Sequence, residues 1–275
     1  MLADVCATLQ MLFNLGVADL VTLFAQGSAG VLLLTGWAFS MPYWLNKIYG
    51  AMSDAFSWYP YCSLSNLIAL DRLLTICLPP QYHLFEGFQR TKLAILFCWL
   101  YSSAWFLLFL SPKASFVFTP QTYSFYFDLL NPTFTWTSCL INLAWWQTFF
   151  FLNFSALYYI VIILFLHARR QQSNQSARQE SLLQKEVAIF KQGALIYVYT
   201  ILVDQYFHWS TTFYYDYGFR YAFAFGNLLV ILNAAVNPIV YLLINKRISS
   251  KVFKMLHLKA GRVTAVTPKH HPRSG

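Results

Sequence analysis

The chain has 275 residues, of which 58% are hydrophobic and 19% aromatic, while only 11% are charged. An ordinary soluble domain carries about 25% charged residues, so this composition excludes a soluble globular protein. The net charge of +9 does not indicate nucleic-acid binding, because the basic residues flank apolar segments, where they set membrane orientation.

Six apolar segments are long enough to cross a membrane as helices, since a span needs about 20 apolar residues. They cover residues 11–39, 52–78, 93–110, 136–166, 187–207 and 221–244. Their lengths exclude the ten-residue alternating strands of an outer-membrane barrel. We therefore expect an all-α fold, a polytopic membrane bundle of six transmembrane helices within residues 1–245.

The basic residues indicate the orientation of this bundle. Of the 19 lysines and arginines, only Lys47, Lys113 and Arg220 fall on one side of the expected membrane. Loops rich in Lys and Arg stay cytoplasmic, so the other side faces the cytoplasm. With six spans, both termini are expected inside.

The C-terminal region is strongly basic. Between residues 246 and 259, apolar side chains recur at near-helical spacing among lysines and arginines. This pattern predicts a short cytoplasmic amphipathic helix on an anionic membrane surface, with a disordered basic tail as the alternative. Residues 260–275 are expected to be disordered.

Ionisable and polar residues in the apolar segments are candidates for function, because they are costly in a membrane and usually face a cavity or one another. In the last segment, Asn233, Asn237 and Tyr241 are four residues apart and share one helix face. Pro238 removes a backbone donor and predicts a kink. This combination is typical of a hinge, although a purely structural kink is the alternative.

Several short motifs carry a family resemblance. NLGVADL at residues 14–20, LDR at 70–72 followed by LPPQY, and NPIVY at 237–241 with a basic amphipathic helix after it resemble the second, third and seventh helices of rhodopsin-type G-protein-coupled receptors. LDRLLTICLPPQYHLF and KEVAIFKQG resemble the class x group of nematode serpentine chemoreceptors most closely.

The resemblance implies a seven-transmembrane receptor fold, of which the six spans would be helices 2–7. It implies that a small external molecule or peptide binds in the outer half of the bundle and that a heterotrimeric G protein is activated at the cytoplasmic mouth. The expected location is the plasma membrane, with sensory cilia as one site. No enzyme activity or cofactor is implied.

For the cytoplasmic end, the resemblance makes Arg72 the coupling residue. Asp71 is its adjacent partner and Glu186 the cross-helix partner, while Asn237, Pro238 and Tyr241 form the seventh-helix switch. A partly buried ion pair is a weak source of stability but a suitable two-state switch. The alternative is that Arg72 only anchors the helix at the headgroups.

Asp19, Asn233 and Asn237 match the sodium site of the family. Tyr61 stands where the family usually has a serine, so we expect a water-filled polar network rather than sodium, and no other metal site.

Asp54 lies eighteen residues before Arg72, where amine receptors of the family place a ligand-binding carboxylate. Near Trp58 it could bind an amine by ion pairing and cation–π contact. Tyr61 and Asp204 complete the expected pocket. The alternative is that Asp54 is an ordinary polar residue near a loop.

The chain also departs from the family pattern. Lys47 replaces the cysteine at the outer end of the third helix, so the usual disulfide to Cys139 is expected to be absent. Only thirteen residues precede NLGVADL, so the first helix is expected to be missing. A truncated, non-signalling family product is therefore an alternative. A transporter is less favoured, because paired broken helices are not evident.

Overall fold

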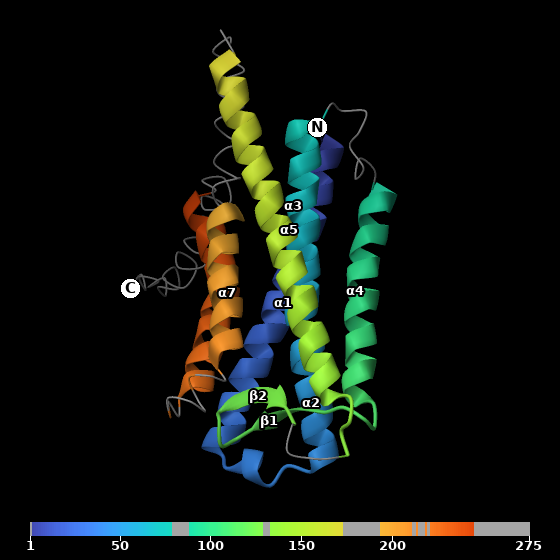
Figure 1. The fold of residues 1–275 in the computed structure, drawn as a ribbon, viewed down its shortest axis with the longest axis vertical. Helices are drawn as coiled ribbons and strands as arrows, with labels where there is room; N and C mark the ends of the chain where they lie inside the picture. The colour runs from blue at the N-terminus through green and yellow to red at the C-terminus, as the bar shows by residue number, and fades with distance from the viewer. Residues whose placement is uncertain are drawn as a thin grey trace, which may run out of the picture.

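The computed structural model describes residues 2–78, 88–128, 133–172, 193–210, 213, 218 and 221–244, with side chains for 9–78, 89–128, 133–168, 193–210, 213, 218 and 221–236. The long helices run roughly side by side along one axis (Figure 1). They are α1 (Leu2–Leu34), α3 (Trp58–Cys77), α4 (Phe88–Leu110), α5 (Thr137–Gln172), a helix over 193–210, and α7 (Ala222–Ile244). The expected all-α helical bundle is confirmed.

The surface of the bundle is apolar. Among the residues that the structure describes, three stretches are long and apolar enough to cross a membrane, Leu9–Leu34, Gln89–Leu110 and Thr137–Ala168. Large apolar side chains such as Phe24 and Leu34 point outward with 75% and 90% of their surface exposed. Contiguous outward apolar surface of this kind marks a membrane or partner contact, and here it fits helices that face lipid.

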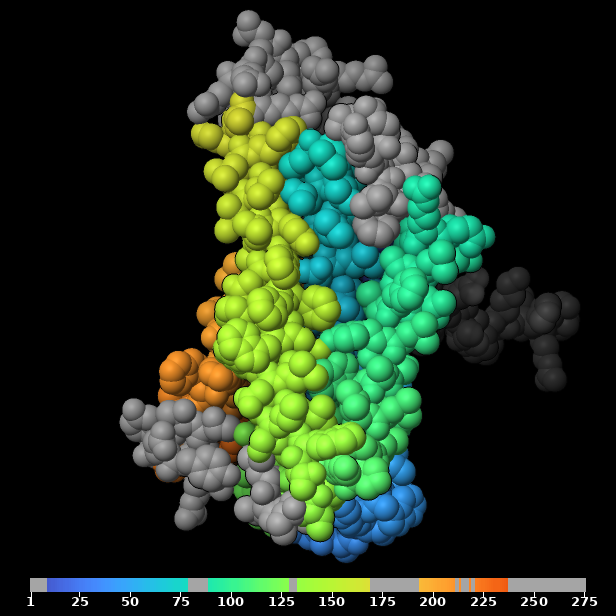
Figure 2. Space-filling view, turned by 45° about the vertical axis from the view of Figure 1, so that its right-hand side comes forward, coloured from blue at the N-terminus to red at the C-terminus, as the bar shows by residue number. Residues whose placement is uncertain are grey.

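α3 is the central helix and packs against α1, α4 and α5. Figure 2 shows α3 between α5 and α4 near one end of the molecule. Polar contacts fix these neighbours: Asn66 on α3 donates to the Phe151 carbonyl and to Ser155 Oγ of α5 at 3.0 and 2.9 Å. The indole of Trp99 on α4 donates to Asn14 on α1 at 3.0 Å.

The segment expected as one helix over 52–78 is divided in the structure. α2 (Tyr43–Ala55) ends before Phe56 and Ser57, and α3 begins at Trp58. Pro60 explains the break, because it has no N–H for the Phe56 carbonyl and its ring crowds the preceding turn. The other expected segments each overlap one of α1, α4, α5, the 193–210 helix and α7.

A β-hairpin, which the sequence analysis did not anticipate, lies across the end of the bundle next to α2 (Figure 1). Its antiparallel strands are β1 (Phe116–Thr119) and β2 (Ser124–Phe127), paired from Phe116 opposite Phe127 to Thr119 opposite Ser124. Buried aromatic side chains of the hairpin join a core with the adjacent ends of α2, α3 and α4. The tail regions 246–259 and 260–275 and the residue Glu186 lie outside the described residues.

Candidate functional site

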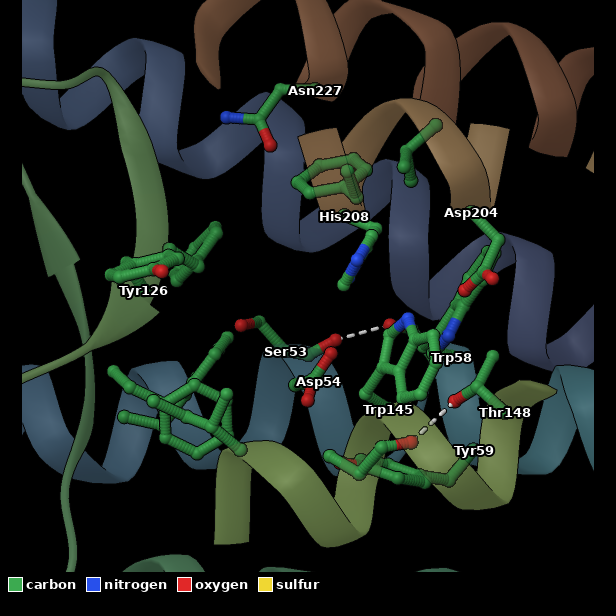
Figure 3. Close-up of a pocket in the computed structure, with 18 of the residues that line it drawn as sticks. Ser53, Asp54, Trp58, Tyr59, Tyr126, Trp145, Thr148, Asp204, His208 and Asn227 are labelled. Atoms are coloured by element: carbon green, nitrogen blue, oxygen red, sulfur yellow. Dashed lines mark hydrogen bonds between the residues drawn. The ribbon is translucent and has the colours of Figure 1, made fainter. Parts of the chain in front are cut away.

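A cavity of about 340 Å³ opens between the hairpin and the adjacent ends of the helices. Figure 3 shows side chains from α2, α3, the hairpin, α5, the 193–210 helix and α7 around it. Its walls are largely aromatic: Trp58, Tyr59, Phe116, Phe125, Tyr126, Phe127, Trp145 and Phe207. Its polar groups are Gln26, Ser53, Asp54, Ser57, Thr148, Asp204, His208 and Asn227. We call this space the outer cavity.

The break between α2 and α3 supplies one wall of the outer cavity. Asp54 lies in the last turn of α2, and Trp58 and Tyr59 lie in the first turn of α3. Tyr59 is fixed by stacking on Trp105, with ring centroids 4.6 Å apart, and its hydroxyl interacts with the Asp54 carboxylate. The expected pocket residues Asp54 and Trp58 therefore both face the cavity.

The opposite wall carries two buried polar atoms that have no hydrogen-bond partner among the residues that the structure describes. Asp204, on the 193–210 helix, is only 8% exposed, and its Oδ2 has no hydrogen-bond partner among the described residues. The indole Nε1 of Trp145 on α5 is likewise buried and unpaired within the described part of the chain. The Trp145 ring lies against His208, with centroids 4.8 Å apart. Buried polar atoms are normally paired, so each of these two atoms is available for a hydrogen bond with a molecule in the cavity.

One face of α2 holds the hairpin over the cavity. Asn46 donates to the Phe118 carbonyl and accepts from the Phe118 N–H, both at 2.8 Å. Gly50, one turn further, packs directly on the backbone of Phe116 and Val117. Since positions three and four apart share a helix face, these contacts form one continuous line along α2.

The same face continues at the start of α2. The Tyr43 hydroxyl donates to Ser115 Oγ at 2.6 Å and to Asp128 Oδ2 at 3.0 Å. Burial is the main reason that the pKa of Tyr43 rises to about 12, so this phenol stays protonated and keeps donating at physiological pH.

Lys47 ties α2 to the loop on either side of the hairpin. Its ammonium donates to the Ser111 carbonyl at 2.6 Å and lies 5.1 Å from the centre of the Phe134 ring. Burial lowers the pKa of Lys47. Cys139 is exposed and free. The lysine, which stands where the family resemblance implies a cysteine, thus connects α2 to the segments before and after the hairpin.

The far end of the hairpin is fixed to α7. The Asn227 amide donates to the Tyr123 carbonyl at 2.7 Å, and its oxygen accepts from Ser124 Oγ at 3.4 Å. Tyr123 adopts a left-handed backbone conformation with φ of 56° in the hairpin turn. The hairpin is therefore clamped between α2 and α7, with the outer cavity beneath it.

Tyr61 lies away from the outer cavity, contrary to the expectation from sequence. Its ring stacks on Trp58, 5.9 Å away, and its hydroxyl lies 2.9 Å from Thr200 Oγ1. Thr200 Oγ1 in turn donates to Asn233 Oδ1 at 3.0 Å. This chain of hydrogen bonds from Tyr61 through Thr200 to Asn233 joins α3, the 193–210 helix and α7. It lies beside a smaller cavity of about 50 Å³ that Tyr61 and Thr200 line.

The other residues of the expected polar network are less fully described. Asp19 is buried in α1, and Asn233 takes part in the chain from Tyr61 and Thr200. The side chain of Asn237 lies outside the described residues. The sequence analysis missed Thr200, because a lone threonine in an apolar segment gives no signal of its partners.

At the end of α3 away from the outer cavity, Asp71 and Arg72 are within ion-pair range, with 4.0 Å between Oδ2 and Nε. Asp71 is buried and Arg72 is half-buried. Arg72 acts electrostatically on the Tyr159 phenol of α5, whose hydroxyl lies where a side chain at Gly193 would project. Glu186 and the side chains of Pro238 and Tyr241 lie outside the described residues.

Comparison with known proteins identifies the family. The family described as serpentine type 7TM GPCR chemoreceptor Srx matches residues 20–249. Among solved structures, the crystal structure of squid rhodopsin superposes with a TM-score of 0.61 at 13% sequence identity, covering 91% of this chain and 80% of the rhodopsin chain. No curated protein sequence matches. The rhodopsin similarity shows the fold, and the family match shows that the chain belongs to the Srx family of serpentine chemoreceptors, multi-pass G-protein-coupled receptors rather than enzymes.

Proposed function

We propose that this receptor binds a small external molecule in the outer cavity and activates a heterotrimeric G protein at the opposite end of the bundle. The observation that carries the proposal is the cavity of about 340 Å³ with aromatic walls and two carboxylates. Small-molecule sites have volumes of roughly 300–1,000 Å³, mostly apolar walls and a few polar groups. This size favours a small molecule over a peptide.

The 193–210 helix offers a physical route from the cavity to the cytoplasmic end. Gly193, Thr200 and Asp204 are seven and four residues apart, so they share one face of the helix. This face contacts Tyr159 at Gly193, the Tyr61–Asn233 chain at Thr200, and the outer cavity at Asp204. A small rotation of the helix would therefore change all three contacts together.

Ligand binding would act by shifting the population between two arrangements of the bundle. In the proposal, Asp71 and Arg72 form the switch on α3, with Glu186 as the cross-helix partner of Arg72. Asn237, Pro238 and Tyr241 supply the hinge on α7, and Asp19 with Asn233 belongs to the polar network between them. The G protein would engage the mouth around Arg72.

The orientation of the basic residues supports placing this mouth in the cytoplasm and the hairpin outside the cell. We propose the plasma membrane as the site of action, including that of sensory cilia, where an external chemical cue reaches the outer cavity. The lipid bilayer and the G protein are the expected partners.

The test is agonist-driven nucleotide exchange on a purified G protein by receptor in lipid nanodiscs. Arg72→Ala should reduce the exchange rate at least about tenfold, because a coupling arginine contributes mainly charge-assisted contacts. Arg90→Ala is the matched control, since Arg90 is an exposed arginine near the start of α4, and it should leave exchange near the native rate. Undiminished exchange by Arg72→Ala would contradict the proposed coupling role.

A further inference from the structure

We propose that the ligand is a small organic cation and that Asp204, on the 193–210 helix, is its counter-ion. This inference rests on the proposed function, because it assigns the ligand class for the same outer cavity. The sequence alone pointed to Asp54 for an amine, so the structure moves the anchoring role from α2 to the facing helix.

The state of the Asp204 carboxylate is the first observation. Its side chain lines the outer cavity and is 8% exposed, and Oδ2 has no hydrogen-bond partner in the described residues. A buried carboxylate is costly unless it is paired. Ionisable groups at such positions in membrane proteins usually face a functional cavity, and here the cavity is where a partner can enter.

The described residues around the outer cavity supply little to neutralise Asp204. Within the described part of the chain, no lysine or arginine lines the outer cavity. His208 lies one turn along the same helix, but its ring is placed against Trp145. Asp54 already interacts with the Tyr59 hydroxyl. Asp204 is therefore the less satisfied of the two carboxylates and the better site for an incoming positive charge.

The surrounding side chains suit the rest of such a ligand. The Trp58 and Trp145 rings line the outer cavity together with Asp204, and Figure 3 shows the three side chains around it. Aromatic faces attract cations and pack on apolar groups. The Trp145 N–H, which has no partner among the described residues, offers one donor, so the geometry favours an amine with an apolar body and one hydrogen-bond acceptor.

Binding at Asp204 would also reach the signalling contacts directly. Thr200 lies one turn before Asp204 on the same face, and it holds Tyr61 and Asn233. An ammonium group drawn to Asp204 would bias the position of this helix. The ligand charge and the polar chain are thus coupled through a single rigid element.

Two measurements on the full-length receptor in nanodiscs test the inference. The first is the thermal shift caused by 2-phenylethylamine, benzylamine, tyramine and hexylamine, each compared with its alcohol counterpart, in which a hydroxyl replaces the amino group. At least one amine should raise the melting temperature, while its counterpart should not. In Asp204→Asn the affinity for that amine should fall about 10- to 100-fold, which is the worth of a charge-assisted hydrogen bond, whereas Asp54→Asn should reduce it less.

The second measurement needs no ligand. If the Asp204 carboxylate is neutralised only by a bound cation, Asp204→Asn should raise the melting temperature of the ligand-free receptor. Binding residues are commonly kept at the expense of stability. A lower melting temperature would assign Asp204 a structural role and overturn the inference. The inference would also be overturned if no amine raised the melting temperature, or if the alcohols raised it equally. Unchanged amine affinity in Asp204→Asn would overturn it as well.

These outcomes are separable from failure of the proposed function, because binding is measured without a G protein. Amine binding through Asp204 without nucleotide exchange would contradict the signalling role and leave the ligand assignment intact. Nucleotide exchange driven by neutral compounds, without amine binding, would contradict the ligand assignment and leave the signalling role intact.

Discussion

Asn46 and Phe118 are joined by two hydrogen bonds of 2.8 Å, one in each direction, between the side chain of a helix residue and the backbone of a strand. This pair fixes the position of the hairpin relative to α2, because the side-chain amide of Asn46 bonds both the N–H and the carbonyl of one strand residue. The hairpin position is therefore set by specific polar contacts as well as by its aromatic packing.

Asn46→Ala should lower the free energy of unfolding by about 1–3 kcal/mol, because the Phe118 backbone groups lose their partners. Thermal unfolding and hydrogen exchange at the hairpin amides would measure the effect. Asn153→Ala is the control, since Asn153 is an exposed α5 residue bonded to the Phe149 carbonyl of its own helix. Similar stability of both variants would show that the hydrogen bonds between Asn46 and Phe118 contribute little to stability.

Gly50→Ala should destabilise the receptor, although alanine normally stabilises a helix by about 1 kcal/mol relative to glycine. A Cβ at this position would overlap the Phe116 carbonyl oxygen and lie 2.9 Å from the Val117 Cα. Gly27→Ala in α1 is the matched control, because its Cβ would meet nothing within 4 Å. The two substitutions should change the melting temperature in opposite directions, and a rise for both would disprove the close contact.

Tyr61 and Thr200 should be energetically coupled. In a double-mutant cycle, Tyr61→Phe and Thr200→Val should each destabilise the receptor, and the double variant should lose less than the sum by about 0.5–3 kcal/mol. Basal nucleotide exchange should also change, since the contact joins α3 to the 193–210 helix. Additive effects on stability would mean that the hydroxyls do not interact.

We expect Tyr43 to make the thermal stability of the receptor depend on pH in the alkaline range. Its pKa rises from 10.0 to about 12 on folding, chiefly through burial. A raised folded-state pKa gives stability that is present below the unfolded pKa and is lost as the pH rises towards the folded value. The melting temperature of native receptor minus that of Tyr43→Phe should therefore be positive at pH 8 and shrink between about pH 10 and pH 12. A constant difference would exclude this contribution of Tyr43.

Much of the candidate site could be anticipated residue by residue, but its arrangement could not. Asp54, Trp58 and Asp204 were predicted in the outer pocket, and all three line the cavity. Tyr61 was assigned to it as well, yet it turns toward Thr200 and the polar chain. Counting positions along a helix gives the depth of a residue in the membrane, but not which side chains of other helices lie next to it. His208 enters the site because α5 and the 193–210 helix meet there, where its ring lies against Trp145, which no local pattern indicates.

The sequence by itself determined the class of the protein. Long apolar segments must be helices because a bilayer cannot satisfy free backbone groups, and the motifs around Asp19, Arg72 and Pro238 carried the family resemblance. The break between α2 and α3 was not predicted, although Pro60 explains it as a local effect. Only the tertiary structure decided that the hairpin covers the cavity, that α2 holds it through Asn46, and that Asp204 Oδ2 has no hydrogen-bond partner among the described residues. These features depend on contacts between segments far apart in the chain, and hydropathy and spacing within one segment contain no information about them.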